Sequence, residues 1–295
     1  MTRRAVLLLA YGAADSLSEI PAYLGDILGG RPVPDALIAQ VTERYKKMGG
    51  RSPLKAITAA QAEGLRTRLG DDYRVYVGMR HSPPWIKDAV SEMREDGVDE
   101  IIGLPLTPYD SEMSVGEYLA KLGKAIVSTG GPLTVREVRG WNLHPKLIDG
   151  YAARIAEVND DPEACLLLTA HSLPARIVDE GDPYTHALAE TAAAVHARSG
   201  LARMEFGYQS AGGSGREPWL GPDAGEVLEQ LASEGVKSVL LSPIGFVSEH
   251  METLYDDDIL YRAKAESLGI RYTRAKTLND HPAFLDALAD VVRTA

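Results

Sequence analysis

Cys165-Leu-Leu-Leu-Thr-Ala-His-Ser-Leu-Pro174 begins as a continuous apolar run and ends abruptly in a polar cluster. A run without polar alternation is typical of a strand buried on both faces, as in a parallel sheet covered by helices. Pro174 cannot continue a strand, so the strand is expected to end near His171 and Ser172. Ligands of open α/β sheets bind outside the carboxyl ends of strands. This position favours a chemical role for His171, although a histidine satisfied by local hydrogen bonds fits the segment equally well.

Strand and helix signals alternate along the whole chain. The predicted strands are 5–11, 73–79, 100–106, 133–138, 165–170, 204–208, 238–241 and 271–274. The predicted helices include 17–28, 35–48, 54–69, 85–95, 145–158, 184–199, 224–233, 249–268 and 283–294, and a polar loop is expected at 107–114. This α/β alternation indicates parallel sheets with helices on both faces. A domain boundary is expected near 140–144, with the last helix returning to the first half.

The composition is that of an ordinary globular protein of one large or two smaller domains. The chain has 295 residues, 45% hydrophobic and 25% charged. Its formal net charge of -11 disfavours nucleic acid or an anionic membrane face as a partner. Cys165 is the only cysteine, which excludes an intrachain disulfide and an iron–sulfur cluster built by this chain alone. The apolar N-terminal stretch is short and predicts a strand rather than a signal peptide, so a cytoplasmic location is expected.

Two further stretches carry candidate chemistry. The long loop 209–222 is rich in glycine, but its spacing does not match a phosphate-binding loop. In the predicted helix after Gly245, Glu249, Glu252 and Asp256 recur at three- and four-residue steps and would share one face. Such a face is either a solvated helix start, where acids favour the helix dipole, or a cation path with oxygen ligands and a nearby histidine, His250 or His171.

Five segments in this order resemble the ferrochelatase family, which inserts ferrous iron into a porphyrin. The matching segments are Tyr11-Gly12, Arg44-Tyr-Lys-Lys-Met-Gly-Gly-Arg-Ser-Pro-Leu54, Ala170-His-Ser-Leu-Pro174 with Gly181-Asp-Pro-Tyr184, Gln209-Ser210 with Pro218-Trp-Leu-Gly-Pro-Asp223, and Gly245-Phe-Val with His250-Met-Glu-Thr-Leu-Tyr-Asp256. The resemblance implies two Rossmann-like, doubly wound parallel-sheet domains with the active site in the cleft between them. The implied domains are 1–142, joined by the terminal helix 281–295, and 143–280, which carries the histidine and the acidic helix.

The resemblance also implies roles for individual residues. His171 and Glu252 match the family's inner catalytic pair, and His171, Glu252 and Asp256 are the implied metal ligands. The implied substrate-binding residues are Tyr11, Arg31, Ser52, Arg80, Ser111, Ser114, Tyr118 and Trp219. Two positions depart from the family pattern. Leu260 replaces a carboxylate found in some members, which puts the outer metal site in doubt, and Leu28-Gly29 replaces an arginine pair beside Arg31.

The chemistry accounts for these residue types, because insertion removes two pyrrole protons and strips water from iron. A histidine titrating near neutral pH accepts a proton or binds metal as neutral imidazole, and a neighbouring carboxylate takes the other role. Which of His171 and Glu252 is base and which is ligand stays open. Iron is a substrate here, and no prosthetic cofactor is expected.

Coproporphyrin III carries four propionates and stays in water, so an enzyme without a membrane-seeking segment is expected to use it as the substrate. The expected product is Fe-coproporphyrin (coproheme), in a step of haem biosynthesis. The stretch 12–31 is interrupted by acidic and hydroxyl residues and forms no interfacial amphipathic helix, so stable membrane insertion is not expected. The alternatives are a protoporphyrin IX ferrochelatase, a cobalt or nickel tetrapyrrole chelatase, and a tetrapyrrole carrier without turnover. A monomer with transient contacts to other haem-pathway enzymes is expected.

Overall fold

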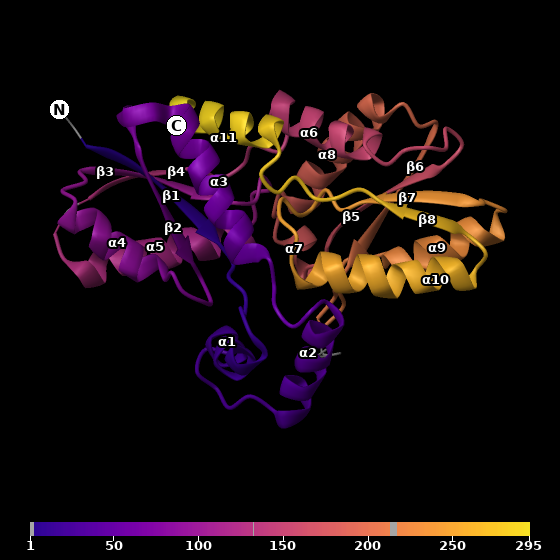
Figure 1. Ribbon diagram of the computed structural model, residues 1–295, viewed down its shortest axis with the longest axis horizontal. Coiled ribbons are helices and arrows are strands. Elements are labelled where there is room, and N and C mark those ends of the chain that lie inside the picture. Colours follow the sequence, from indigo (N-terminus) through magenta and orange to yellow (C-terminus); the bar gives the residue numbers. More distant parts are fainter. Residues whose placement is uncertain (1–2, 132, 213–216) are drawn as a thin grey trace. The chain divides into compact units, whose positions relative to one another are not determined.

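The computed structural model describes residues 3–131, 133–212 and 217–295. The chain forms two compact units. Unit 1 comprises Met1–Trp141 and Leu285–Ala295, and unit 2 comprises Asn142–Phe284. Both are α/β structures, and each can be followed in Figure 1 by its labelled strands and helices. Within the described ranges, no helix is long and apolar enough to cross a membrane.

Unit 1 is built on a parallel four-stranded sheet with the order β2-β1-β3-β4. Its central strand β1 is buried at every position after Arg4, as expected for a strand covered on both faces. The elements of this unit are β1 (Arg4–Ala10), η1 (Leu17–Glu19), α1 (Ile20–Ile27), α2 (Asp35–Lys47), α3 (Leu54–Leu69), η2 (Gly70–Asp72), β2 (Arg74–Met79), α4 (Ile86–Glu95), β3 (Glu100–Pro105), η3 (Glu112–Gly116), α5 (Glu117–Thr129), β4 (Thr134–Glu137) and most of α11 (Pro282–Thr294).

Unit 2 repeats the same topology with the order β6-β5-β7-β8, again all parallel. Its central strand is β5, the apolar segment that ends at His171. The elements are α6 (Pro145–Ala156), β5 (Cys165–His171), α7 (Arg176–Asp179), α8 (Tyr184–Ser199), β6 (Arg203–Gln209), α9 (Ala224–Ser233), β7 (Ser238–Ser242), η4 (Glu252–Tyr261), α10 (Arg262–Ser267) and β8 (Arg271–Arg274).

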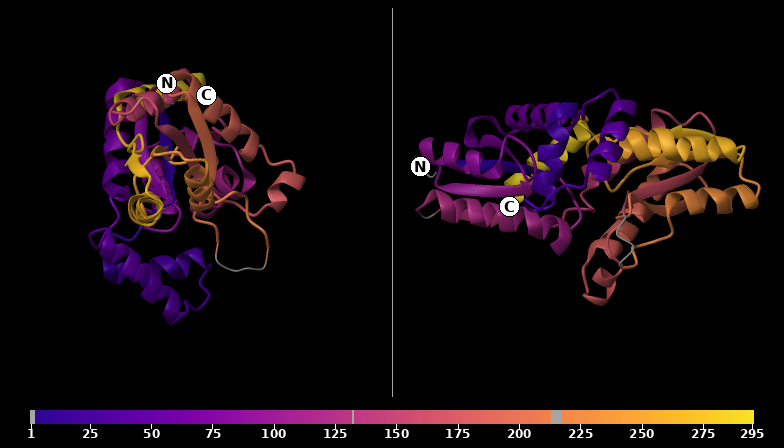
Figure 2. Two further views of the ribbon diagram at one scale, coloured as in Figure 1. Left: turned by 90° about the vertical axis from the view of Figure 1, so that its right-hand side faces the viewer. Right: turned by 90° about the horizontal axis from the view of Figure 1, so that it is seen from below.

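Helices cover both faces of each sheet, and Figure 2 shows the two helical layers of each unit from other sides. In unit 1, α4 and α5 pack on one face of the sheet through apolar residues such as Leu7, Val90 and Leu122. In unit 2, α9, η4 and α10 cover one face through residues such as Leu167 and Leu228. Because these cores bury the central strands β1, β3, β5 and β7, ligands of these sheets are expected at the strand ends and the loops after them.

The predicted fold class, two parallel α/β units, is confirmed. One local prediction is wrong: the expected loop at 107–114 is interrupted by η3, a π-helix from Glu112 to Gly116. The helix predicted at 249–268 is confirmed, but its first part, η4 (Glu252–Tyr261), is a π-helix, and only its second part, α10, is an α-helix. A π-helix closes its hydrogen bonds over five residues instead of four, which changes the residues that share a face, and such helices often occur at functional sites.

Candidate active site

His171 ends β5, and its ring is held in one orientation. Its Nδ1 hydrogen-bonds the Ser172 carbonyl, which can only accept, so Nδ1 carries a proton. The Tyr184 hydroxyl donates to the His171 carbonyl at 2.8 Å and fixes the backbone at the strand end. Behind this strand end, the loop after β7 passes so closely that a Cβ on Gly245 would lie 2.5 Å from Ala170 Cα. These contacts leave Nε2 as the reactive nitrogen of His171.

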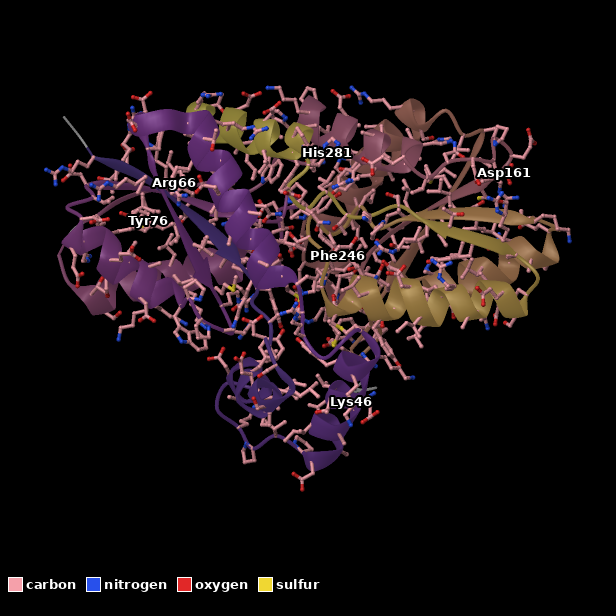
Figure 3. All side chains as sticks on the ribbon, viewed as in Figure 1. Lys46, Arg66, Tyr76, Asp161, Phe246 and His281 are labelled. Carbon is pink, nitrogen blue, oxygen red and sulfur yellow. The ribbon has the colours of Figure 1, made fainter. Side chains whose placement is uncertain are left out.

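Glu252 lies between two imidazoles at the start of η4. Its Oε1 is 3.4 Å from Nε2 of His171, and its Oε2 is 3.3 Å from Nε2 of His250. His250 is also held through Nδ1, which lies 3.0 Å from the Ser248 carbonyl. Phe246, labelled in Figure 3, packs near both rings, with centroids 6.4 Å from His171 and 4.7 Å from His250. Two histidines thus present the same ring nitrogen to one carboxylate.

The charges of this cluster are coupled. Burial opposes ionisation of both groups, but the His171 and His250 rings outweigh it and hold the pKa of Glu252 well below its usual range. Burial likewise lowers the pKa of His171, yet the Glu252 carboxylate outweighs that effect and raises it overall. The imidazole proton and the carboxylate charge therefore stabilise each other. A cation approaching Glu252 would weaken that attraction and favour release of the proton.

Asp256 lies in η4 on the stretch that follows Glu252, and it is buried. Ser210 donates its hydroxyl to Asp256 and adopts a left-handed backbone with φ of 59°. The same loop supplies Gln209, whose side-chain amide donates to the Glu252 carbonyl at 3.3 Å. A left-handed backbone is unfavourable for serine, so the contacts of this loop must offset its cost. Those contacts orient Asp256 and the start of η4.

The shared acidic face predicted for Glu249, Glu252 and Asp256 is wrong at Glu249. This carboxylate precedes η4 and is buried in an ion pair with Arg274, 2.8 Å away. It also accepts hydrogen bonds from the Thr253 hydroxyl at 2.6 Å and the Thr277 amide at 3.0 Å. Neither a solvated helix start nor a cation path includes it. The prediction failed because the partner of Glu249 is Arg274 in β8, which is near Glu249 only in the folded structure.

Three predicted substrate-binding residues of unit 1 come together. The Arg80 guanidinium lies 5.6 Å from the Tyr11 ring centroid and 5.2 Å from that of Tyr118. Tyr11 itself is 41% exposed, so part of its ring faces solvent. Gly12, with φ of +98°, makes the turn possible, since a Cβ there would lie 2.6 Å from Ser82 Oγ.

The other predicted substrate-binding residues differ in accessibility. Ser52 and Ser111 are buried, and their hydroxyls accept backbone hydrogen bonds from Leu54 and Met113. Ser114 lies in η3 and is half-buried. Arg31 is exposed and donates Nε to the Leu28 carbonyl at 2.9 Å. Trp219 is half-buried, pairs with Pro174 through a β-bridge, and has no hydrogen-bond partner for its indole nitrogen among the described residues.

Two features of the site are poorly visible in the sequence. His250 was one of two candidate histidines there, and the structure joins it to Glu252 together with His171. His81 was not identified as a site residue, yet it lies beside Tyr11 with ring centroids 4.6 Å apart and pairs with Asp26. Asp26 and His81 are 55 residues apart, so only the position of His81 after a predicted strand could have indicated it.

Across the described ranges, no group of three or more His, Cys, Asp or Glu side chains is arranged to hold a metal ion. Imidazole nitrogens and carboxylate oxygens nevertheless suit divalent iron.

Several solved structures share this fold at low sequence identity. SirB from Bacillus subtilis with Fe3+ matches with a TM-score of 0.62 and 13% identity, covering 99% of this chain and 95% of that one. CbiX, described as the terminal enzyme for biosynthesis of sirohaem in denitrifying bacteria, matches with a TM-score of 0.57 and 17% identity, with 99% of each chain covered. The fold is therefore that of the chelatases.

Sequence comparisons identify the family of chelatases to which the chain belongs. The ferrochelatase family model matches residues 3–295. A ferrochelatase of Deinococcus radiodurans is 40% identical over 298 residues, covering 97% of this chain and 94% of that protein. Coproporphyrin III ferrochelatases of Anoxybacillus flavithermus and Halalkalibacterium halodurans are 39% and 37% identical, covering 97% and 99% of this chain and 94% and 98% of those proteins. The chain belongs to the ferrochelatase family.

Proposed function

We propose that this chain inserts ferrous iron into coproporphyrin III and releases Fe-coproporphyrin, a step of haem biosynthesis. The observation that carries the proposal is the His171–Glu252 pair, 3.4 Å apart at the end of β5, in a chain of the ferrochelatase family. The names of the Anoxybacillus and Halalkalibacterium relatives support the choice of porphyrin. The enzyme is a lyase of the metal-chelatase type.

The pair can perform the two tasks that insertion requires. Because Ser172 fixes Nδ1, Nε2 of His171 and a Glu252 oxygen are the two reactive atoms. Each can accept a proton or coordinate iron. When iron approaches one partner, a proton held on the pair is released to water, and the other partner then accepts a proton from a pyrrole nitrogen. Asp256, one η4 turn further, guides iron toward the pair.

The basic and aromatic residues of unit 1 account for a substrate with several carboxylates. The Arg80 guanidinium lies 5.6 Å from the Tyr11 ring centroid and 5.2 Å from that of Tyr118. The positive charge of the Arg80 guanidinium can attract a propionate. Arg31 is exposed and offers a second guanidinium. The remaining proposed contacts are Ser52, Ser111, Ser114 and Trp219.

The proposal extends to the organisation of the enzyme. The functional domains are 1–142 with 281–295, and 143–280. The enzyme is a cytoplasmic monomer that takes iron as a substrate, contains no iron–sulfur cluster and does not insert stably into a membrane. Transient contacts with other haem-pathway enzymes deliver the porphyrin and remove the product.

Anaerobic turnover assays test the proposed reaction. Ferrous iron is supplied with coproporphyrin III or protoporphyrin IX in detergent-free buffer, and kcat/KM is compared under conditions that keep both porphyrins monomeric. The expected preference for coproporphyrin III is at least about tenfold, or about 1.4 kcal/mol in the barrier. A preference for protoporphyrin IX would overturn the substrate assignment. Binding of porphyrin without metal insertion would indicate a carrier, and preferential insertion of cobalt or nickel into another tetrapyrrole would indicate a different chelatase.

A further inference from the structure

Unit 1 contains a second histidine–carboxylate pair that the mechanism above does not use. Nδ1 of His81, in the loop after β2, lies 2.6 Å from Oδ2 of Asp26 in α1. The His81 backbone amide donates to the Tyr11 carbonyl at 3.0 Å, so the loop continues the pairing of β2 with β1 beyond the strand ends. This places the pair at the carboxyl edge of the sheet, beside the exposed ring of Tyr11.

The pairing fixes how His81 can react. A carboxylate only accepts, so the neutral ring donates its Nδ1 proton to Asp26 and keeps a lone pair on Nε2. No hydrogen bond of Nε2 occurs among the described residues, and Nε2 is not one of the side-chain nitrogens sealed from solvent. In His171 the fixed nitrogen faces a neutral backbone carbonyl, whereas in His81 it faces a charge. Asp26 can therefore stabilise the imidazolium that forms when Nε2 accepts a proton.

The groups around His81 keep it unprotonated until it reacts. Burial is the largest influence and lowers its pKa, while the hydrogen bond to Asp26 opposes this and the charges of Arg80 and Lys121 add to the lowering. Lys121, from α5, lies 3.6 Å from Asp26, and Glu117 on the same helix pairs with Arg80 at 3.2 Å. Neutral imidazole is the form that accepts a proton. The two cations also favour return of that proton to solvent afterwards.

We propose that Nε2 of His81 accepts one of the two pyrrole protons of the porphyrin, and that Asp26 positions and charges the ring for this step. The inference rests on the proposed function, because it requires a porphyrin bound against Tyr11. In the step, a pyrrole N–H bond breaks and an Nε2–H bond forms, and the electron pair left on the pyrrole nitrogen becomes available to iron. The imidazolium then gives its proton to water. The His171–Glu252 pair accepts the other proton, so both protons of the neutral porphyrin are accounted for.

The test distinguishes the effect of the negative charge of Asp26 from the effect of its hydrogen bond to His81. Asp26→Asn keeps an oxygen that can accept the Nδ1 proton but removes the negative charge. His81→Ala removes the acceptor and leaves room for added imidazole. Glu190→Gln is the matched control, since Glu190 forms a histidine–carboxylate pair with the exposed His186, 3.6 Å away. Single-turnover insertion of ferrous iron is followed anaerobically from pH 5.5 to 9, together with the porphyrin Kd and the thermal unfolding midpoint.

The expected result is a loss of rate without a loss of binding. Asp26→Asn should lower the single-turnover rate constant at least about tenfold, and His81→Ala at least about a hundredfold, the range of general-base catalysis. The acid limb of the Asp26→Asn profile should move to lower pH, because removing the carboxylate lowers the pKa of His81. Added imidazole should restore at least about a tenth of the lost rate in His81→Ala. Glu190→Gln should match wild type throughout.

Two outcomes would overturn the inference. One is an Asp26→Asn variant with the wild-type rate and acid limb. The other is a His81→Ala variant whose loss comes from porphyrin Kd or unfolding and does not respond to imidazole, which would make the pair a tether between α1 and the loop. The proposed function is tested separately, by the turnover of the wild-type enzyme with each porphyrin. If wild type turns over only protoporphyrin IX, the substrate assignment fails, and the variants are compared with that porphyrin instead.

Discussion

Arg274 Nη1 lies 2.8 Å from Oε1 of Glu249, and both side chains are less than a tenth exposed. Arg274 also contacts Asp258 at 2.7 Å, so one cation from β8 serves two carboxylates beside η4. Arg274→Met would leave Glu249 buried without a counter-charge, whereas Asp258 is 30% exposed and keeps Arg262 3.8 Å away. We expect it to lower the free energy of unfolding by about 3 kcal/mol or more in urea denaturation. The control is Lys264→Met, which breaks an exposed pair with Glu229 and should cost about 1 kcal/mol or less. Equal losses would contradict the buried pair's structural role.

The same pair predicts how stability depends on pH. Burial would raise the pKa of Glu249, but Arg274 and the hydrogen bonds to it lower it below its ordinary value of 4.5. The folded state therefore binds fewer protons than the unfolded state, and the stabilisation is complete above pH 4.5 and lost as pH falls through the folded-state pKa. The difference in unfolding free energy between wild type and Glu249→Gln should shrink as pH falls below 4.5. A difference independent of pH would be inconsistent with an ionised Glu249.

Asp257 should behave in the opposite way. It is fully buried in η4, neither carboxyl oxygen has a hydrogen-bond partner among the described residues, and burial raises its pKa well above the ordinary value. The folded state keeps a proton that the unfolded state loses, so this group destabilises the fold increasingly as pH rises above 3.8. Asp257→Asn should be more stable than wild type at pH 8, with a gain that vanishes near pH 4. Asp258→Asn, which loses a contact with Arg274, should be less stable. A destabilised Asp257→Asn at pH 8 would refute this assignment.

Asp256 tests the proposed path of iron. Asp256→Ala should raise the KM for ferrous iron about tenfold, or about 1.4 kcal/mol, while kcat changes about twofold or less, because Asp256 guides the metal and does not react. Asp256→Asn keeps an acceptor for the Ser210 hydroxyl and shows whether the charge or the hydrogen bond matters. KM is measured at saturating porphyrin. An unchanged KM in both variants would remove Asp256 from the iron path.

The sequence predicted the elements that local patterns determine. The apolar run before His171 forms β5 and ends where Pro174 requires, and most helices lie within a few residues of their expected positions. The family resemblance joined His171 to Glu252, which are 81 residues apart and meet at 3.4 Å. Local periodicity alone could not have made that connection.

The errors arise where tertiary packing overrides local spacing. Steps of three and four residues predict one acidic face on an α-helix, but η4 is a π-helix, and Thr253, Asp256, Asp257 and Tyr261 are the residues it buries. Arg274 neutralises Glu249 only because β8 lies beside β7. Asp26 meets His81 only because α1 and the loop after β2 converge. In each case the partner comes from a distant part of the sequence.

Single-turnover insertion of ferrous iron into coproporphyrin III by His171→Ala and Glu252→Gln tests the central claim most directly. Circular dichroism and porphyrin binding confirm that each variant is folded and loaded before iron is added. Because each side chain is about a quarter to a third exposed at the strand end, neither is required for the core. The account predicts that both variants lose nearly all insertion. A variant that binds porphyrin normally and retains more than about a tenth of the wild-type rate, a barrier change below about 1.4 kcal/mol, would contradict it.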